Sequence, residues 1–246
     1  VSNLLSRYKN YSLFSFGEYN IKEGAIRYNA NINHWNESDR IYINNTFIEI
    51  DKKGHSVTLG NLQEPLEASF YGRGIKYSYQ NTAKGTVLEF GVSDNSTELL
   101  NPLQGFKDNP FSAYSRIKLG EGKLDGKAYD GQIIINNNLF DSTSSLLWTN
   151  SFDIVKHHNK NSIKGYIGAG TLQKTNGIDN EQRSSFAGGL KTNFQSGKLG
   201  LFTDYFYSTS YYPGNRRGMT QFINRLSLPL GKWQGSLGYN YFIYAP

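Results

Sequence analysis

The sequence predicts an all-β protein whose antiparallel strands form a transmembrane β-barrel, and three observations lead to this prediction. Apolar and polar residues alternate along most of the chain, as expected for strands with one apolar and one polar face. No apolar stretch approaches the roughly 20 residues that a membrane helix needs. Short turns rich in Lys, Gly and Asn alternate with longer, more variable connections, an asymmetry typical of outer-membrane barrels.

The alternation is clearest near the C-terminal end. The side chains of one parity there are mostly aromatic or aliphatic: Trp233, Gly235, Leu237, Tyr239, Tyr241 and Ile243. Those of the other parity are small, polar or basic: Lys232, Gln234, Ser236, Gly238 and Asn240. Such a segment fits a strand that separates an apolar from a polar environment.

Alternation and turn chemistry predict about 14 strands, many close to the roughly 9–11 residues of a tilted membrane strand. The strands are expected near 8–19, 25–35, 40–50, 55–61, 68–80, 86–93, 113–120, 127–138, 145–156, 162–173, 184–195, 199–211, 219–229 and 233–244. Short turns are expected near 20–24, 51–54, 81–85, 120–126, 157–161, 196–198 and 230–232. Longer connections are expected near 36–39, 62–67, 94–112, 139–144, 174–183 and 212–218. We interpret residues 1–246 as a single β-barrel domain.

This strand count places the first strand's start and the last strand's end on the long-loop side, whereas both termini of outer-membrane barrels are expected on the other side. Open strand edges are not tolerated in lipid. Either this count is wrong by one strand at each end, or the chain is a piece of a larger barrel. We favour the second interpretation, in which strands from elsewhere complete the barrel. No signal peptide is recognised at the first residues, so the expected form is cytosolic, mature and exported, or a fragment.

Composition excludes several classes of protein. Apolar residues make up 37% of the chain and aromatic residues 15%, which suits a barrel with only one apolar face. The absence of cysteine excludes disulfides, zinc–thiolate sites and a cysteine nucleophile. The net charge of +6 is spread along the chain without a basic stripe, so we expect no nucleic-acid partner.

Charged residues on the polar parity are candidates for lining the lumen, because a charge at mid-bilayer costs roughly 2–4 kcal/mol. These candidates are Arg27, Lys76, Lys164, Asp204 and Arg225. The alternative is that they only form pairs or contact water inside a filled lumen.

Tyrosines gather towards the long-loop ends of two strands. They predict an aromatic girdle at the headgroup level, formed chiefly by Tyr205, Tyr207, Tyr211, Tyr239 and Tyr241. The neighbouring aromatic residues Phe206, Tyr212, Phe242 and Tyr244 are included in the same cluster. In a soluble protein these rings would instead stack on sugars.

The segment 57–60, which ends in Thr58-Leu59-Gly60, is followed by Phe70-Tyr71-Gly72-Arg73-Gly74-Ile75. This pattern, over about 20 of the 246 residues, resembles one in bacterial outer-membrane export barrels, the fimbrial ushers and the type 9 secretion translocon. The resemblance implies a role in passing polymers outward. Gly72 and Gly74 on either side of Arg73 predict a bend that places a cation at the barrel rim.

Catalytic and metal-binding patterns are not recognisable. The acidic residues of the loops at 94–112 and 176–181 lack EF-hand spacing, and the adjacent His157 and His158 would point apart on an extended segment. Nothing resembles a nucleophile elbow. We expect no enzyme activity, no cofactor and no metal.

The sequence therefore predicts an integral protein of the bacterial outer membrane that acts as a pore, an export channel or an envelope scaffold. Its expected partners are the lipid bilayer, lipopolysaccharide and other envelope chains that complete or plug the barrel. The alternative is a soluble all-β carbohydrate-binding module.

Overall fold

The computed structural model describes residues 10–35, 41–96, 99, 110–120, 127–138, 143–157, 161–176 and 179–245. These residues form 15 β-strands, and the pairs with a defined register are antiparallel. Within these ranges, no helix has the length and apolar content needed to cross a membrane.

The strands belong to two compact units. Among the described residues, unit 1 runs up to Pro65 and includes Phe70–Tyr79 and the residues between Glu89 and Ala113. Unit 2 consists of Leu66–Ser69, Gln80–Leu88 and the residues from Tyr114 onward. Strands β6, β7 and β8 therefore contribute residues to both units.

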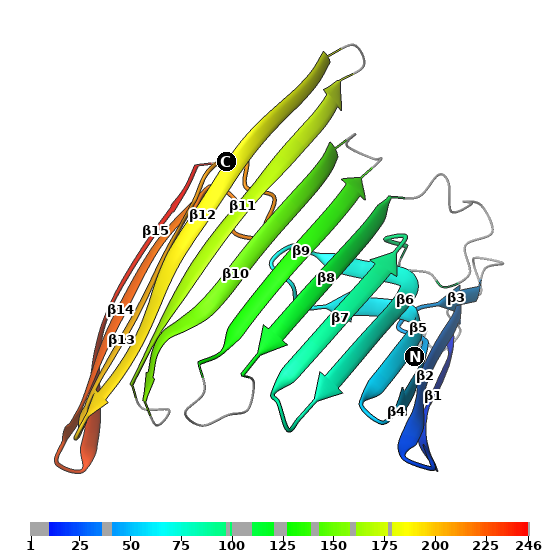
Figure 1. The fold of residues 1–246 in the computed structure, drawn as a ribbon, viewed down its shortest axis with the longest axis horizontal. Helices are drawn as coiled ribbons and strands as arrows, with labels where there is room; N and C mark the ends of the chain where they lie inside the picture. Colours follow the sequence, from blue (N-terminus) through cyan, green and yellow to red (C-terminus); the bar gives the residue numbers. More distant parts are fainter. Residues whose placement is uncertain are drawn as a thin grey trace, which may run out of the picture. The chain divides into compact units, whose positions relative to one another are not determined.

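Unit 1 holds the strands drawn in blue and cyan in Figure 1. They are β1 (Asn10–Ile21), β2 (Gly24–Trp35), β3 (Ile41–Ile43), β4 (Phe47–Lys52), β5 (His55–Glu64), most of β6 (Phe70–Asn81) and part of β7 (Thr86–Ser93). Their hydrogen-bonded order is β1-β2-β4-β5-β6-β7, with β3 paired to β2.

The predicted continuous strand at 40–50 is wrong, because it is divided into β3 and β4 at Asn44–Thr46. Asn45 has a φ of 48°, a left-handed conformation that interrupts a strand. The hydroxyl of Thr46 accepts the backbone N–H of Asn31 at 2.9 Å and donates to the carbonyl of Asn44 at 3.1 Å. This division raises the strand count from the predicted 14 to 15.

Unit 2 contains most of β8 and all of the following strands, each paired with the next in sequence. They are β8 (Phe111–Leu119), β9 (Tyr129–Asn138), β10 (Thr143–His157), β11 (Asn161–Asn176), β12 (Asp179–Ser196), β13 (Leu199–Ser208), β14 (Met219–Leu230) and β15 (Trp233–Tyr244). Figure 1 shows β9 to β12 running side by side.

The connections agree with the prediction in most of the described places. Tight turns lie between β1 and β2, β4 and β5, β6 and β7, β12 and β13, and β14 and β15. The predicted long loop at 174–183 is wrong, because β11 extends to Asn176 and β12 begins at Asp179, which is its register partner. The connections expected near 36–39, 120–126, 139–144 and 157–161, and most of 94–112, lie outside the described residues.

Apolar and polar side chains separate onto opposite faces in both units, as the alternation predicts. In unit 1 the register aligns Tyr28, Ile48, Leu59 and Ile75 across four strands, and all four are more than 40% exposed. In unit 2 the corresponding exposed apolar residues include Ile133, Ile135, Leu146, Trp148, Ile167, Phe186, Leu190, Tyr205 and Tyr207. Exposed apolar residues in this number on one face of a sheet indicate a surface that contacts a membrane or another protein.

Candidate functional site

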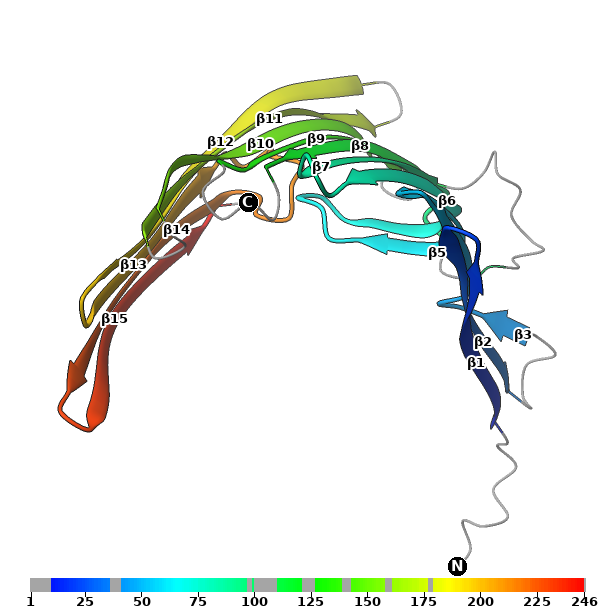
Figure 2. The same ribbon diagram turned by 60° about the horizontal axis from the view of Figure 1, so that its bottom comes forward.

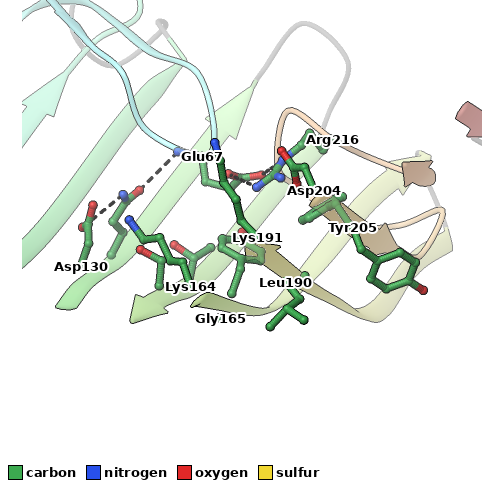
Figure 3. A pocket seen from close by; sticks show the side chains of 15 residues that line it. Glu67, Asp130, Lys164, Gly165, Leu190, Lys191, Asp204, Tyr205 and Arg216 are labelled. Carbon is green, nitrogen blue, oxygen red and sulfur yellow. Dashed lines mark hydrogen bonds and ion pairs between the residues drawn. The ribbon is translucent and has the colours of Figure 1, made fainter. Parts of the chain in front are cut away.

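Three charged side chains lie next to one another on the polar face of unit 2. The register places Lys164 of β11 opposite Lys191 of β12, and Lys191 opposite Asp204 of β13. They line a cavity of about 260 Å³ (Figure 3). The structure thus brings together two predicted lumen residues, Lys164 and Asp204, and adds Lys191, which the sequence-based list omits.

The two lysines differ from Arg116, whose partner Asp130 lines the same cavity. Among the described residues, neither Lys164 nor Lys191 has a carboxylate within ion-pair distance, although the Nζ of Lys191 lies 5.3 Å from the centre of the Phe202 ring. By contrast, Arg116 donates to Asp130 from Nε at 2.9 Å and from Nη2 at 2.6 Å. Like charges directly opposite on neighbouring strands repel each other. The lysine pair therefore favours an anion in this cavity.

The connection between β13 and β14, residues 209–218, covers the polar face beside the cavity. Figure 2 shows this segment, in orange, beneath β10 and β11. Tyr212 is fully buried, and its hydroxyl bonds to that of Tyr166. A Cβ atom on Gly168 would lie 2.8 Å from the Tyr212 hydroxyl, and one on Gly170 would lie 2.7 Å from Pro213 Cγ. Glycines at these two positions therefore make the close approach possible.

An ion pair holds this connection to the segment 66–69. The Arg216 guanidinium donates to the Glu67 carboxylate at 2.9 and 3.1 Å (Figure 3). It also stacks over the Phe206 ring at 3.5 Å from the centroid. Burial by itself would lower the pKa of Arg216, but the hydrogen bonds and charge of Glu67 outweigh burial and raise it. The guanidinium therefore stays charged in the physiological range.

Backbone hydrogen bonds reinforce the same contact. The Asn215 N–H donates to the Glu67 carbonyl at 2.7 Å, and the Asn215 side-chain amide donates to the Leu66 carbonyl at 3.2 Å. The Glu67 N–H in turn donates to the Gln132 side chain at 3.3 Å. Buried apolar side chains of unit 2 accompany these bonds: Leu66, Ala68, Ile134, Leu147, Ala187, Phe206 and Met219. The segments 66–69 and 209–218 thus form a fixed cover rather than loose surface loops.

The burial of two aromatic residues corrects the sequence-based interpretation. Phe206 and Tyr212, included in the predicted girdle cluster, are 1% and 0% exposed. Phe206 points to the polar face because it shares the parity of Asp204, and Tyr212 lies within the cover. The five principal girdle residues, Tyr205, Tyr207, Tyr211, Tyr239 and Tyr241, are all exposed.

The remaining predicted lumen residues lie elsewhere on the polar faces. In unit 1, Arg27 pairs with Glu18 at 3.1 Å and with Glu49 at 2.7 Å, and Lys76 pairs with Glu64 at 2.6 Å. In unit 2, Arg225 of β14 is exposed and lies opposite Phe202 in register. These three do not join the cavity of Lys164 and Asp204.

The glycines around Arg73 belong to an irregular part of β6. Gly72 has a φ of 134°, which side-chain-bearing residues rarely adopt. A Cβ atom on Gly74 would collide with the Val92 carbonyl. Arg73 itself donates from Nε to the buried Asp94 carboxylate at 2.7 Å. Asp94, considered above among the acidic loop residues, is therefore used as an ion-pair partner.

The Tyr166–Tyr212 contact can be tested by removing one hydroxyl. Tyr212→Phe should destabilise the folded protein by about 1 kcal/mol, because the Tyr166 hydroxyl loses a buried hydrogen-bond partner. Urea titration of the folded fraction in detergent would measure the change. Tyr211→Phe is the adjacent control: Tyr211 is exposed and contacts Arg183, so its loss should cost no more than a few tenths of a kcal/mol. Equal losses for both variants would contradict the buried contact.

Comparison with known proteins identifies the fold. No family model matches the sequence, and no curated protein does either. The structure is similar to that of the outer membrane protein OpdK from Pseudomonas aeruginosa, with a TM-score of 0.52, 9% identity, and coverage of 90% of this chain and 71% of that chain. The fold is that of an outer-membrane β-barrel. OccK2 (OpdF) of the same organism, solved in complex with glucuronate, also has a TM-score of 0.52, with 10% identity over 90% of this chain and 69% of that chain.

The cover was missed in the sequence-based analysis, although a signal for it exists. The polar parity of β11 and β12 carries Gly168, Gly170, Ala187 and Gly189, a group of small residues where bulky polar ones would be expected. Small residues on one face of neighbouring strands indicate that another segment packs there closely.

Proposed function

We propose that this chain forms part of the wall of an outer-membrane pore in a two-membraned bacterium. The observation that supports this proposal is the pairing of a broad exposed apolar face with a polar face that carries ion pairs and a charged cavity. A lipid-facing exterior and a polar lumen are the defining features of such barrels.

In this proposal the exposed apolar side chains contact lipid acyl chains. The tyrosines Tyr205, Tyr207, Tyr211, Tyr239 and Tyr241 lie at the headgroup level, where they contact lipids including lipopolysaccharide. The polar face surrounds the lumen, and the charged residues Arg27, Lys76, Lys164, Asp204 and Arg225 line it. Passage through the pore is passive, and the cover formed by 66–69 and 209–218 narrows the path beside Lys164 and Lys191.

The proposal is tested with the full chain in detergent and in lipid. The folded protein should fractionate with membranes, migrate differently on gels before and after heating, and produce conductance steps in a planar bilayer. The proposed pore function would be contradicted if the polypeptide were monodisperse in detergent-free buffer, or if it folded in lipid without producing conductance.

Charge reversal at the two unpaired lysines tests the proposed lumen. Lys164→Glu with Lys191→Glu should lower the anion-to-cation permeability ratio by about fivefold, the factor for roughly 1 kcal/mol of interaction in a water-like dielectric. Reversal potentials under a salt gradient would measure it. Lys198→Glu, in the exposed turn between β12 and β13, is the control and should leave the ratio almost unchanged. An unchanged ratio in the double variant would show that these lysines do not line the path.

A finer assignment, as an export channel or part of a larger assembly, rests on a local feature of unit 1. Gly60 and Gly74, from the two segments that resemble usher and type 9 translocon barrels, lie directly opposite in register. Other envelope chains that complete or plug the barrel would be the expected partners. Detergent extraction of native membranes followed by affinity purification should then recover those chains in a fixed ratio, and recovery of this chain alone would contradict the assembly.

A further inference from the structure

Unit 1 has a cavity of its own, with a chemistry unlike that of the lysine-bearing cavity. It has a volume of about 660 Å³ and lies among β2, the turn before β4, β5 and β6. This volume is in the range of small-molecule sites, roughly 300–1,000 Å³. Its lining is dominated by side-chain amides: Asn31, Asn44, Asn45, Asn61 and Gln63.

Several of these amides are available to a ligand. Within the described part of the chain, the side chains of Asn44, Asn45 and Gln63 make no hydrogen bond, and all three are exposed. The Asn31 side-chain oxygen already accepts from Asn33 at 2.8 Å, which leaves its amide nitrogen to donate. Each amide can both donate and accept. The cavity therefore presents alternating donors and acceptors.

The charges in the cavity are already compensated. Glu49 accepts from Arg27 at 2.7 Å and from the Thr58 hydroxyl at 3.2 Å. Glu64 accepts from Lys76 at 2.6 Å. A charged ligand would have to compete with these ion pairs, whereas a neutral ligand would not.

Two aromatic residues complete the lining. Tyr71 of β6 is 45% exposed, and Phe47 stands at the start of β4. An exposed ring in a cavity rich in amides offers a flat apolar surface beside hydrogen-bonding groups. A sugar ring has the matching features, with C–H groups on its faces and hydroxyls around its edge.

We propose that this cavity binds a neutral saccharide of two or three sugar rings, with Tyr71 against one ring face and Asn44, Asn45 and Gln63 at the hydroxyls. The test of this site is independent of the proposed pore function, because binding to the detergent-folded chain requires no conductance. The ligand class follows from the compensated charges and the free amides.

Calorimetric titration of the full chain in detergent with maltotriose, cellobiose, diacetylchitobiose and glucuronate tests this proposal. At least one of the three neutral sugars should bind with millimolar or better affinity, and more tightly than glucuronate. Tyr71→Ala should weaken that binding about tenfold, as expected when an aromatic anchor is removed from a site. Gln63→Ala should weaken it about threefold to tenfold, the range for one hydrogen bond.

Tyr77→Ala is the matched control, because Tyr77 lies on the same strand, is exposed and does not line the cavity. It should leave the affinity within about twofold of the original. Gel mobility before and after heating confirms that each variant is folded. The proposal is overturned if no neutral sugar binds, if glucuronate binds best, or if Tyr77→Ala weakens binding as much as Tyr71→Ala. Failure of the conductance test would leave these results unaffected.

Discussion

Arg216→Ala should destabilise the folded protein by roughly 2 kcal/mol and release the cover from the polar face. The substitution leaves the Glu67 carboxylate, 14% exposed, without its cation, and removes the stacking over Phe206. Breaking a fully buried ion pair costs about 3–5 kcal/mol. Because Arg216 is 32% exposed, we expect a smaller loss of stability, roughly 2 kcal/mol. Urea titration would measure the stability, and a rise in single-channel conductance would report the wider path.

The neighbouring Arg217 provides a matched control. It is exposed and has no ion pair within the described part of the chain, so Arg217→Ala should change stability by less than about 0.5 kcal/mol and leave the conductance unchanged. If Arg216→Ala matched this control in both measurements, the Glu67–Arg216 pair would not be what holds the cover.

Ile167→Arg, on the exposed apolar face, should strongly impair folding in lipid. Ile167 lies near the middle of β11 and is 44% exposed on the apolar face. A charge that faces the middle of the bilayer costs roughly 2–4 kcal/mol, a large part of the stability of a typical domain. The fraction folded in lipid vesicles, measured by gel mobility over a urea series, should fall accordingly.

The same charge on the polar face tests whether orientation is the cause. Asn193 of β12 is exposed and lies on the face that carries Lys191, so Asn193→Arg should change stability by no more than about 0.5 kcal/mol. A loss for Asn193→Arg equal to that for Ile167→Arg would mean that both faces meet the same environment, and the membrane assignment would be wrong.

Some of the candidate site follows directly from the sequence. Strand periodicity places Lys164 and Asp204 on the polar parity, and antiparallel neighbours bring side chains of the same parity to the same face. The proximity of Lys191 to both depends on register. Register depends on the lengths of the turns, and the predicted connection at 174–183 was several residues too long.

The segments that form the cover could not be identified from local patterns. Tyr212 has the same local surroundings as an interfacial tyrosine, yet it is buried because residues 209–218 fold back over β11. Glu67, which pairs with Arg216 of the cover, lies 149 residues earlier in the chain. No short-range preference of either residue indicates that contact.

The division between what sequence and tertiary structure each decide has a physical origin. The sequence by itself determined most of the strands, most of the short turns and the two faces, because a strand's side-chain period and a turn's backbone demands are local properties. Only the tertiary structure decided which polar positions are open and which lie under the cover formed by 66–69 and 209–218. That choice depends on packing and ion pairs between segments far apart in the chain, whose energies no single segment contains.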